Sequence, residues 1–341
     1  MPFIVQTNNM NFPQKIEKVI DRYLRYKTTK LAIGIIIDNK TYILNYSDQK
    51  IERRVSSDYY DIGSLSKVFT SILIIQMVSE GKISLKDNIK QYLSLPKGQY
   101  WTIGDLLKHR CDFWHLTPYQ IVLKSLLRAP YEKRNIYQDI SEKEVIKEAI
   151  KRRKHINKRR YGYSDFSTAL LTLVIQEIKH NAFVLEMDTF IKQMFNLRNT
   201  QCIKDNSFKR EAFIGNKQVK PWEWKDDNPY VLGGGIVSTI EDMTSFVKQL
   251  IERQNEPFIK DSFNCDKEDE KHNLTWFLSK RKTSFWHVGG AGTFRSSMII
   301  NPKRRVGLVV LGNQMGRKSG NTHYLVKMIY TNIRRHKITF E

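Results

Sequence analysis

The sequence predicts an α+β fold: an antiparallel sheet flanked by helices and built from both chain ends, with an all-α insertion between them. Three observations predict it. Strand-like apolar runs follow an amphipathic helix near the N-terminus, helical periodicity dominates the middle of the chain, and strand-like runs return before a last helix. A sheet completed by both termini accommodates this order of elements. We expect an α/β sheet domain from residues 1–75 and 226–341, and a mainly helical inserted domain from residues 76–225.

The first elements are a helix and a hairpin. Residues 14–29 place five apolar side chains on one helical face. Residues 31–37 and 41–46 are β-rich runs separated by a polar turn at 38–40, which predicts two antiparallel strands. The apolar residues of the helix are Ile16, Val19, Ile20, Tyr23 and Leu24.

The stretch that begins at Gly63 is the most informative in the chain. Gly63 and Ser64 are a loop and N-cap signal before an apolar run, so we expect Ser64 at a helix N-terminus and a helix stop at Gly81. Lys67 then lies on the same face as Ser64, one turn further on. A desolvated lysine near other cations can be neutral enough to activate a serine, so the two residues have the pattern of a nucleophile and its base. The ordinary alternative is an N-cap serine followed by a surface lysine.

The later elements follow from caps and periodicity. Thr102 caps a short helix, and residues 143–150 and 167–178 have helical periodicity. The three consecutive glycines at 233–235 predict a tight turn, and residues 238–241 predict a capping box that opens the next helix. We expect strands at 273–278, 284–288, 294–300 and 306–311, a loop at 301–305 and a closing helix at 321–334.

Composition indicates a globular protein that favours anionic partners. The chain has 341 residues, of which 40% are hydrophobic, and 57 Lys and Arg against 35 Asp and Glu give a net charge of +22. Cys111, Cys202 and Cys265 are too widely spaced to suggest a disulfide framework or a zinc site. We expect the protein to be cytoplasmic, because its thiols are expected to be reduced, no run reaches a membrane-spanning length, and the N-terminus lacks an apolar leader. The alternative is the cell envelope, if a leader has been removed.

Four ordered motifs point to one enzyme superfamily. They are the Ser-x-x-Lys motif of Ser64 and Lys67, the Tyr-x-Asp motif of Tyr163 and Asp165, the glycine-rich segment 233–239, and the segment His287, Val288, Gly289 and Gly290. In this order they resemble those of the serine β-lactamase and penicillin-binding-protein superfamily, particularly its class C, D-alanyl-D-alanine carboxypeptidase and esterase branch. The resemblance covers nearly the whole chain. It implies a β-lactamase/transpeptidase-like fold with the active site in the cleft between the two domains, and no cofactor or metal.

The resemblance implies a catalytic role for three residues. Ser64 is the expected acylated nucleophile, and Lys67 is its proton acceptor or the base that tunes it. Tyr163 is expected to relay a proton to the leaving group. Because an unperturbed phenol has a pKa near about 10, this use of Tyr163 requires nearby cations, which Lys67 and His287 are expected to supply.

The resemblance also implies how the substrate is held. His287 and Gly289 lie on an edge strand that pairs with an extended substrate, and the backbone N–H groups of Ser64 and Gly290 form the oxyanion hole. Asp165 departs from the family pattern, because it stands where an asparagine is usual. An ionised carboxylate only accepts hydrogen bonds, so Asp165 is expected to disfavour anionic acyl groups and favour an ammonium. We therefore expect β-lactams to be poor substrates.

A second departure lies upstream. The Leu-Leu-x-His-x-Ser-Gly stretch of the family appears here at residues 106–112, with Cys111 and Asp112 in place of Ser-Gly, which reshapes a turn beneath the site. We interpret His109 and His115 as structural and Cys111 as a buried small residue.

The predicted function is a serine hydrolase that acts through an acyl-enzyme on a D-amino-acid peptide, amide or ester. The alternative is an inactive relative that uses the cleft for binding, an idea motivated by Asp165 and the change at Cys111. The basic run 151–160 is either a solvated face or the rim of the site, where it attracts an anionic polymer such as a teichoic acid carrying D-alanyl esters. Specific nucleic-acid binding is disfavoured, since no recognised motif or interleaved aromatic platform accompanies the charge. The oligomeric state is left open.

Overall fold

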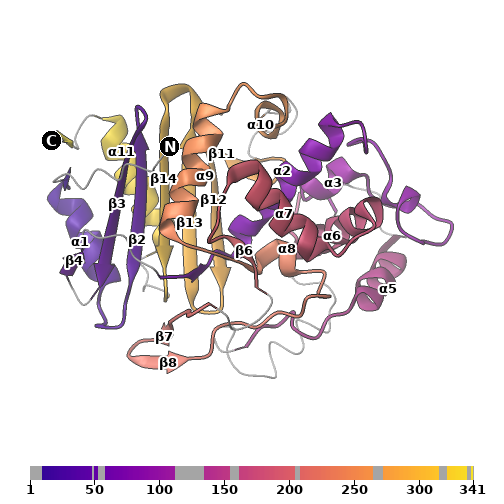
Figure 1. Cartoon of the computed structure of the whole chain (residues 1–341), viewed down its shortest axis with the longest axis horizontal. Helices are drawn as coiled ribbons and strands as arrows, with labels where there is room; N and C mark the ends of the chain where they lie inside the picture. The colour runs from indigo at the N-terminus through magenta and orange to yellow at the C-terminus, as the bar shows by residue number, and fades with distance from the viewer. Residues whose placement is uncertain are drawn as a thin grey trace.

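The computed structural model describes residues 10–47, 50–52, 58–111, 134–153, 161–203, 208–263, 272–314, 321–335 and 339–340. Figure 1 shows a twisted sheet flanked by helices on one side of the molecule and a group of helices on the other. No helix in the described ranges is long and apolar enough to cross a membrane.

The main sheet contains strands from both chain ends. Its described strands are all antiparallel and follow the order β10-β11-β12-β13-β14-β2-β3-β4. Pairing of β14 with β2 joins the two ends, and the register sets Gly312 opposite Leu31. The strands are β2 (Leu31–Ile37), β3 (Lys40–Ser47), β4 (Lys50–Glu52), β10 (His272–Asn273), β11 (Trp276–Leu278), β12 (Phe285–Ala291), β13 (Phe294–Asn301) and β14 (Val306–Gly312).

Helices cover both faces of this sheet. On one face, α1 (Gln14–Tyr23) and α11 (Thr322–Arg334) pack over β2, β3, β13 and β14, and all five apolar residues expected on the first helix are buried there. On the other face, α9 (Ile240–Glu252) packs against β2 and β14 (Figure 1). The predicted α+β fold with a sheet from both chain ends is therefore confirmed.

The remaining helices form the other half of the molecule around α2. This helix is apolar on every side, and all but three of its residues are buried, as expected for a helix surrounded by protein. One continuous hydrophobic core joins α2 and its neighbours to the α9 face of the sheet. The division of the chain into two domains stays a prediction. The helices are α2 (Ser66–Ser79), α3 (Ile103–Leu107), α5 (Glu142–Arg152), α6 (Asp165–Lys179), α7 (Phe183–Phe195), α8 (Val231–Gly234) and α10 (Pro257–Ser262).

Short elements complete the fold. A small sheet with the order β5-β9-β6 lies beside the segment that leads into α2. The short elements are β1 (Met10–Asn11), β5 (Tyr60–Asp61), β6 (Gln201–Cys202), β7 (Ala212–Ile214), β8 (Lys217–Val219), β9 (Ile236–Ser238), β15 (Thr339–Phe340), and the 3₁₀ turns η1 (Gly63–Leu65), η2 (Ile89–Gln91) and η4 (Pro302–Arg304).

Several local predictions need correction. The strand expected at 273–278 is a hairpin, because Leu274 and Thr275 adopt positive φ angles and reverse the chain between β10 and β11. The first helix ends at Tyr23 rather than near residue 29. The helix α9 begins one residue later than expected, with Thr239 as its N-cap accepting from the Asp242 N–H.

The glycine-rich segment is also different from its prediction. Gly233 and Gly234 belong to the short helix α8 instead of a tight turn, and Gly235 follows as its C-cap. The predicted cap of the short helix at Thr102 is confirmed, with a full capping box to Asp105.

Candidate active site

Ser64 lies in the 3₁₀ turn η1, immediately before α2. Ser64 lies at the helix N-terminus as predicted, but it does not cap the helix, because the N-cap position is Leu65 and no side chain caps α2. Gly63 has a φ of +53°, and a Cβ at this position would lie 2.5 Å from the backbone nitrogen of Gly290. Glycine is therefore needed where the turn approaches β12. The Ser64 hydroxyl is directed to Lys67 instead of to the backbone.

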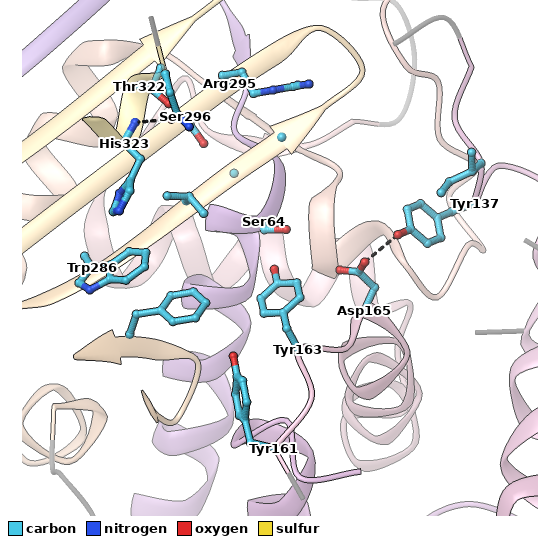
Figure 2. Close-up of a pocket in the computed structure, with 16 residues that line it drawn as sticks. Ser64, Tyr137, Tyr161, Tyr163, Asp165, Trp286, Arg295, Ser296, Thr322 and His323 are labelled. Carbon is cyan, nitrogen blue, oxygen red and sulfur yellow. Dashed lines mark hydrogen bonds between the residues drawn. The ribbon is translucent and has the colours of Figure 1, made fainter. Parts of the chain in front are cut away.

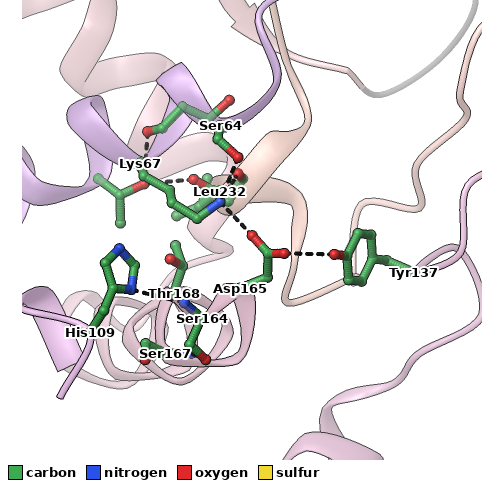
Figure 3. A network of polar contacts seen from close by, with 12 residues as sticks. Ser64, Lys67, His109, Tyr137, Ser164, Asp165, Ser167, Thr168 and Leu232 are labelled. Carbon is green, nitrogen blue, oxygen red and sulfur yellow. Dashed lines mark hydrogen bonds and ion pairs between the residues drawn. The ribbon is translucent and has the colours of Figure 1, made fainter. Parts of the chain in front are cut away.

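Lys67 is buried in the first turn of α2, with a side chain only 1% exposed. Its ammonium Nζ lies 3.1 Å from Ser64 Oγ, donates to the Gly233 carbonyl at 2.5 Å, and pairs with Asp165 Oδ1 at 2.7 Å (Figure 3). Burial lowers the pKa of Lys67, but the Asp165 carboxylate and the Tyr163 hydroxyl outweigh it and raise the pKa above its ordinary value. The expectation of a neutral lysine is therefore wrong for this resting arrangement.

Asp165 connects Lys67 to a tyrosine from a distant part of the chain. It is the first residue of α6, where the helix dipole favours a negative charge, and Ser164 caps the same helix. Oδ2 of Asp165 accepts a hydrogen bond of 2.6 Å from the Tyr137 hydroxyl. Asp165 thus lines the pocket and neutralises Lys67 at the same time.

Tyr163 lies beside the nucleophile. Its hydroxyl points toward Ser64 (Figure 2) and hydrogen-bonds with Ser64 and Lys67. The ammonium of Lys67 lies 5.3 Å from the ring centroid. Burial raises the pKa of Tyr163 more than Lys67 lowers it, so the phenol keeps its proton at neutral pH.

His287 does not line the pocket. Residues of β12 alternate, so that Trp286, Val288 and Gly290 are half-buried beside the pocket while His287 is completely buried on the opposite face. Its Nδ1 lies 2.9 Å from the Val288 carbonyl oxygen. Burial, with the charge of Lys67, lowers the pKa of His287 to about 3. The prediction that His287 supplies a cation to Tyr163 is therefore wrong.

Gly289 and Gly290 bring β12 against the nucleophile turn. A Cβ on Gly289 would lie 2.1 Å from the Ile62 carbonyl oxygen, 2.3 Å from Ser296 Oγ and 3.1 Å from the backbone nitrogen of Ser64. Ser296 Oγ also donates to the Ile62 carbonyl at 2.7 Å. Only a glycine at 289 permits this approach, which sets the backbone of β12 beside that of Ser64. The oxyanion-hole role of Gly290 stays a prediction.

Pairing between β11 and β12 includes the first residues of β12. Among the described residues, this ladder pairs Leu278 with Phe285 and Phe277 with Trp286. That the following part of β12 pairs with an extended substrate stays a prediction.

Ser64 lies near the centre of a pocket of about 880 Å³ (Figure 2). The sequence singled out five of its lining residues: Ser64, Tyr163, Asp165, Gly289 and Gly290. It missed a further set of aromatic and polar residues. Only Trp286 had a signal in the sequence, because side chains alternate along the predicted strand that contains His287. The principal missed residues are Tyr137, Tyr161, Phe277, Trp286, Arg295 and His323.

The other sequence interpretations have mixed outcomes. Cys111 is completely buried, with Sγ 3.0 Å from Ser167 Oγ, and His109 is buried, with Nδ1 accepting from the Ser164 N–H at 3.4 Å. These contacts confirm both as packed interior residues. Asp112, His115, Cys265 and residues 154–160 of the basic run lie outside the described residues. Among the described residues, no group of three or more His, Cys, Asp or Glu could hold a metal ion.

Similar structures share this fold at low sequence identity. The octameric penicillin-binding protein homologue from Pyrococcus abyssi superposes with a TM-score of 0.73 and 18% identity, covering 95% of this chain and 77% of that one. A class C β-lactamase from Rhodobacter sphaeroides has a TM-score of 0.71 and 14% identity, covering 94% and 98%. A β-lactamase/D-alanine carboxypeptidase from Pseudomonas syringae has a TM-score of 0.70 and 15% identity, covering 94% and 97%. They support the β-lactamase/transpeptidase-like fold.

Sequence comparison extends over the same region. Protein flp of Staphylococcus aureus (strain N315) is 22% identical over an alignment of 351 positions, which covers 93% of this chain but only 65% of flp. The chain therefore spans about two thirds of the length of such curated relatives. A β-lactamase of Psychrobacter immobilis is 30% identical over 89 residues, 25% of this chain and 22% of that protein. The sequence pattern of the Beta-lactamase family matches residues 16–328. A match over nearly the whole chain, on a fold with the same architecture, shows that this protein belongs to the beta-lactamase family.

Proposed function

We propose that this protein is a serine hydrolase that acts through an acyl-enzyme at Ser64 on a D-amino-acid peptide, amide or ester, in the manner of a carboxypeptidase or esterase. The observation that carries the proposal is the buried Lys67 Nζ, 3.1 Å from Ser64 Oγ at the base of the pocket. This is the spacing of a nucleophile and the group that handles its proton. The carboxypeptidase activity named for the Pseudomonas syringae protein suggests the substrate class.

In this proposal the base is the pair of Lys67 and Asp165. An ammonium cannot accept a proton, so Lys67 first passes one to the Asp165 carboxylate across the 2.7 Å contact. The resulting amine takes the Ser64 proton as Oγ bonds to the carbonyl carbon, and the tetrahedral oxyanion forms beside the Ser64 and Gly290 N–H groups. Tyr163 then donates its phenolic proton to the leaving group as the bond to carbon breaks, and Lys67 reprotonates Tyr163.

Labelling of the nucleophile tests the proposal. We expect one adduct by intact-protein mass spectrometry after incubation with a fluorophosphonate, and no adduct on Ser64→Ala. Lys67→Ala should slow labelling by about 10²- to 10⁴-fold, the usual contribution of a general base. Ser79→Ala, at an exposed position of the same helix, is the matched control and should label like the wild type. Absence of an adduct on the folded wild-type protein would contradict the proposal.

Substrate class needs a separate panel. We expect D-alanyl esters and peptides to be turned over faster than β-lactams, because the Asp165 carboxylate beside Ser64 disfavours an anion in the acyl part. The measurement is kcat/KM for each substrate at one pH and ionic strength. Faster hydrolysis of β-lactams would overturn this assignment while leaving the nucleophile intact.

A catalytically inactive binding protein is the second candidate. The observation that favours it is that Lys67 and Tyr163 both have raised pKa values, so neither is a ready base in the resting site. The labelling experiment separates the two candidates, since a binding protein forms no covalent adduct.

Two further parts of the proposal concern the surroundings of the enzyme. We propose that the basic run 151–160 attracts an anionic polymeric substrate, and that neutralising it reduces the salt dependence of turnover. Unchanged salt dependence would disprove this role. We propose the cytoplasm as the compartment, with the cell envelope as the alternative, and fractionation of the native cells distinguishes the two.

A further inference from the structure

Four aromatic residues form one wall of the pocket. Phe277 on β11 stacks on Trp286 of β12, with ring centroids 4.4 Å and planes 18° apart. Trp286 packs against His323 at the start of α11, with centroids 4.4 Å apart. On the other side, the Tyr163 ring lies 6.2 Å from Phe277 and within 14° of parallel. We call Tyr163, Phe277, Trp286 and His323 the aromatic wall, and it runs from beside the nucleophile to α11.

The wall faces the pocket because of the register of two strands. Trp286 lies opposite Phe277 in the ladder between β12 and β11, so both side chains are on one face of the sheet. Val288 lies on the same face between Trp286 and Gly290 and also lines the pocket. An apolar surface therefore continues from the predicted oxyanion hole to Trp286.

The two sides of the pocket differ in charge. Asp165 and Tyr137 lie on one side of Ser64, and Trp286 and His323 lie on the other (Figure 2). Burial, with the nearby charge of Lys327, lowers the pKa of His323 to about 4, so the histidine of the wall is neutral at neutral pH. The four rings of this side thus carry no charge themselves, with the Lys327 ammonium 5.4 Å from the Trp286 ring centroid and Arg295 also in the pocket lining, whereas the opposite side carries a carboxylate.

The wall is long as well as apolar. Trp286 precedes Gly290 by four strand residues, a separation of about 13 Å at the usual rise of a β-strand. A methyl or ethyl group beside the reacting carbonyl does not span that length. The pocket of about 880 Å³ is also near the upper end of the size range of small-molecule sites.

From this geometry we propose that the aromatic wall binds an elongated apolar group of the substrate, either an alkyl chain or an aryl group. The inference rests on the proposed function, since it names the substrate chemistry of the same site. The group can belong to the acyl part or to the leaving group, because the wall begins beside Ser64, where both parts of the substrate meet. Contact with these stacked rings and with Val288 stabilises such a group by removing its apolar surface from water.

Kinetics with two series of esters test the inference. The first series is p-nitrophenyl acetate, butyrate and octanoate, and the second is the methyl, butyl and octyl esters of D-alanine. We expect kcat/KM in one series to rise about fourfold for each methylene that reaches the wall. Trp286→Ala and Phe277→Ala should reduce the octyl-to-methyl or octanoate-to-acetate ratio at least about tenfold in that series.

Controls separate the wall from general damage to the fold. Tyr324→Ala removes an exposed aromatic ring next to His323 in the chain, outside the pocket lining, and should leave the ratios unchanged. Val288→Thr keeps the β-branched shape but adds a hydroxyl, so it should lower the same ratio even if a larger truncation does not fold. Ratios that do not respond to Trp286→Ala, Phe277→Ala or Val288→Thr in either series would overturn the inference.

A binding measurement distinguishes failure of the wall from failure of the enzyme proposal. Calorimetry with octanamide and acetamide on Ser64→Ala needs no chemistry at the nucleophile. We expect octanamide to bind at least about tenfold more tightly, and this preference to be lost when Trp286→Ala is added. If the wild type forms no fluorophosphonate adduct but Ser64→Ala keeps this preference, the hydrolase proposal fails and the wall stands. Equal binding of both amides overturns the wall.

Discussion

The buried Lys67 forms an ion pair with Asp165 of the pocket lining, with 2.7 Å between Nζ and Oδ1, and the same Nζ lies 3.1 Å from the hydroxyl of Ser64. The carboxylate fixes the charge of the lysine that the nucleophile faces. The Tyr137 hydroxyl, 2.6 Å from Oδ2, holds the carboxylate in place. An asparagine at 165 would carry no charge and would leave Lys67 without an anionic partner, so the residue that departs from the family pattern sets the electrostatics of the site.

Asp165→Asn should therefore change the pH dependence of the reaction. In the wild type, the proposed acceptor of the Lys67 proton at neutral pH is the Asp165 carboxylate. In the variant, Lys67 must lose a proton to solvent, which becomes easier only as the pH rises. We expect the ascending limb of kcat/KM to move to higher pH and the rate at pH 7 to fall about 10²-fold.

The pH profile of fluorophosphonate labelling measures this effect without knowledge of the substrate. Asp139→Asn, an exposed aspartate near Tyr137 in sequence, is the matched control and should keep the wild-type profile. A limb that moves to lower pH would show that Asp165 hinders Lys67 rather than accepting its proton.

Tyr163→Phe should distinguish leaving groups. Since its pKa is raised, Tyr163 is a protonated phenol that can donate to the leaving group. An amide leaving group needs that proton, so we expect kcat for an amide to fall by about 10²- to 10⁴-fold. A p-nitrophenyl ester leaves as a stable anion and should be affected much less. Tyr161→Phe, in the same pocket, is the control, and an equal loss on both substrates would argue against proton donation.

The two glycines of β12 should respond differently to alanine. A Cβ on Gly289 meets the Ile62 carbonyl oxygen at 2.1 Å, so Gly289→Ala must push β12 away from the Ser64 turn. We expect a loss of about 10²- to 10³-fold in kcat, as for the loss of one oxyanion-hole donor, with a lower Tm. A Cβ on Gly290 would lie at an ordinary contact distance of 3.4 Å from Arg295 Nη1, so Gly290→Ala should stay within a few-fold of the wild type. Equal rates for both variants would contradict the close approach at Gly289.

His287 should make stability depend on pH. Its pKa is about 3 in the folded state against 6.5 for the ordinary side chain, so the unfolded chain binds the extra proton between these values. Stability is then complete above about pH 6.5 and falls as the pH drops, at a rate approaching about 1.4 kcal/mol per pH unit for this single group. Urea unfolding between pH 4 and 7 should show a smaller slope for His287→Gln than for the wild type. The prediction would be refuted if the wild type and His287→Gln had the same slope of stability against pH, or if NMR showed His287 titrating near pH 6.5.

Local signals were sufficient for most elements of the fold. The cap at Thr102, the strand-like runs that became β13 and β14, and the apolar run of α2 depend on residues close in sequence, so their prediction was confirmed. Prediction was wrong where a few backbone angles reverse the chain direction, as at Leu274 and Thr275 between β10 and β11. A positive φ in a non-glycine residue has little signal in the sequence.

The candidate site divides in the same way. By itself the sequence determined which residues form the motifs, because a Ser-x-x-Lys or Tyr-x-Asp spacing is fixed along the chain. Only the tertiary structure decided their charges and surroundings: Asp165 holds Lys67 as an ammonium, burial keeps His287 neutral, and Trp286 with Phe277 forms a wall beside Ser64. The physical reason is that charge and burial depend on neighbours more than 90 residues away in the chain, as between Lys67 and Asp165, and no local pattern specifies which of them meet.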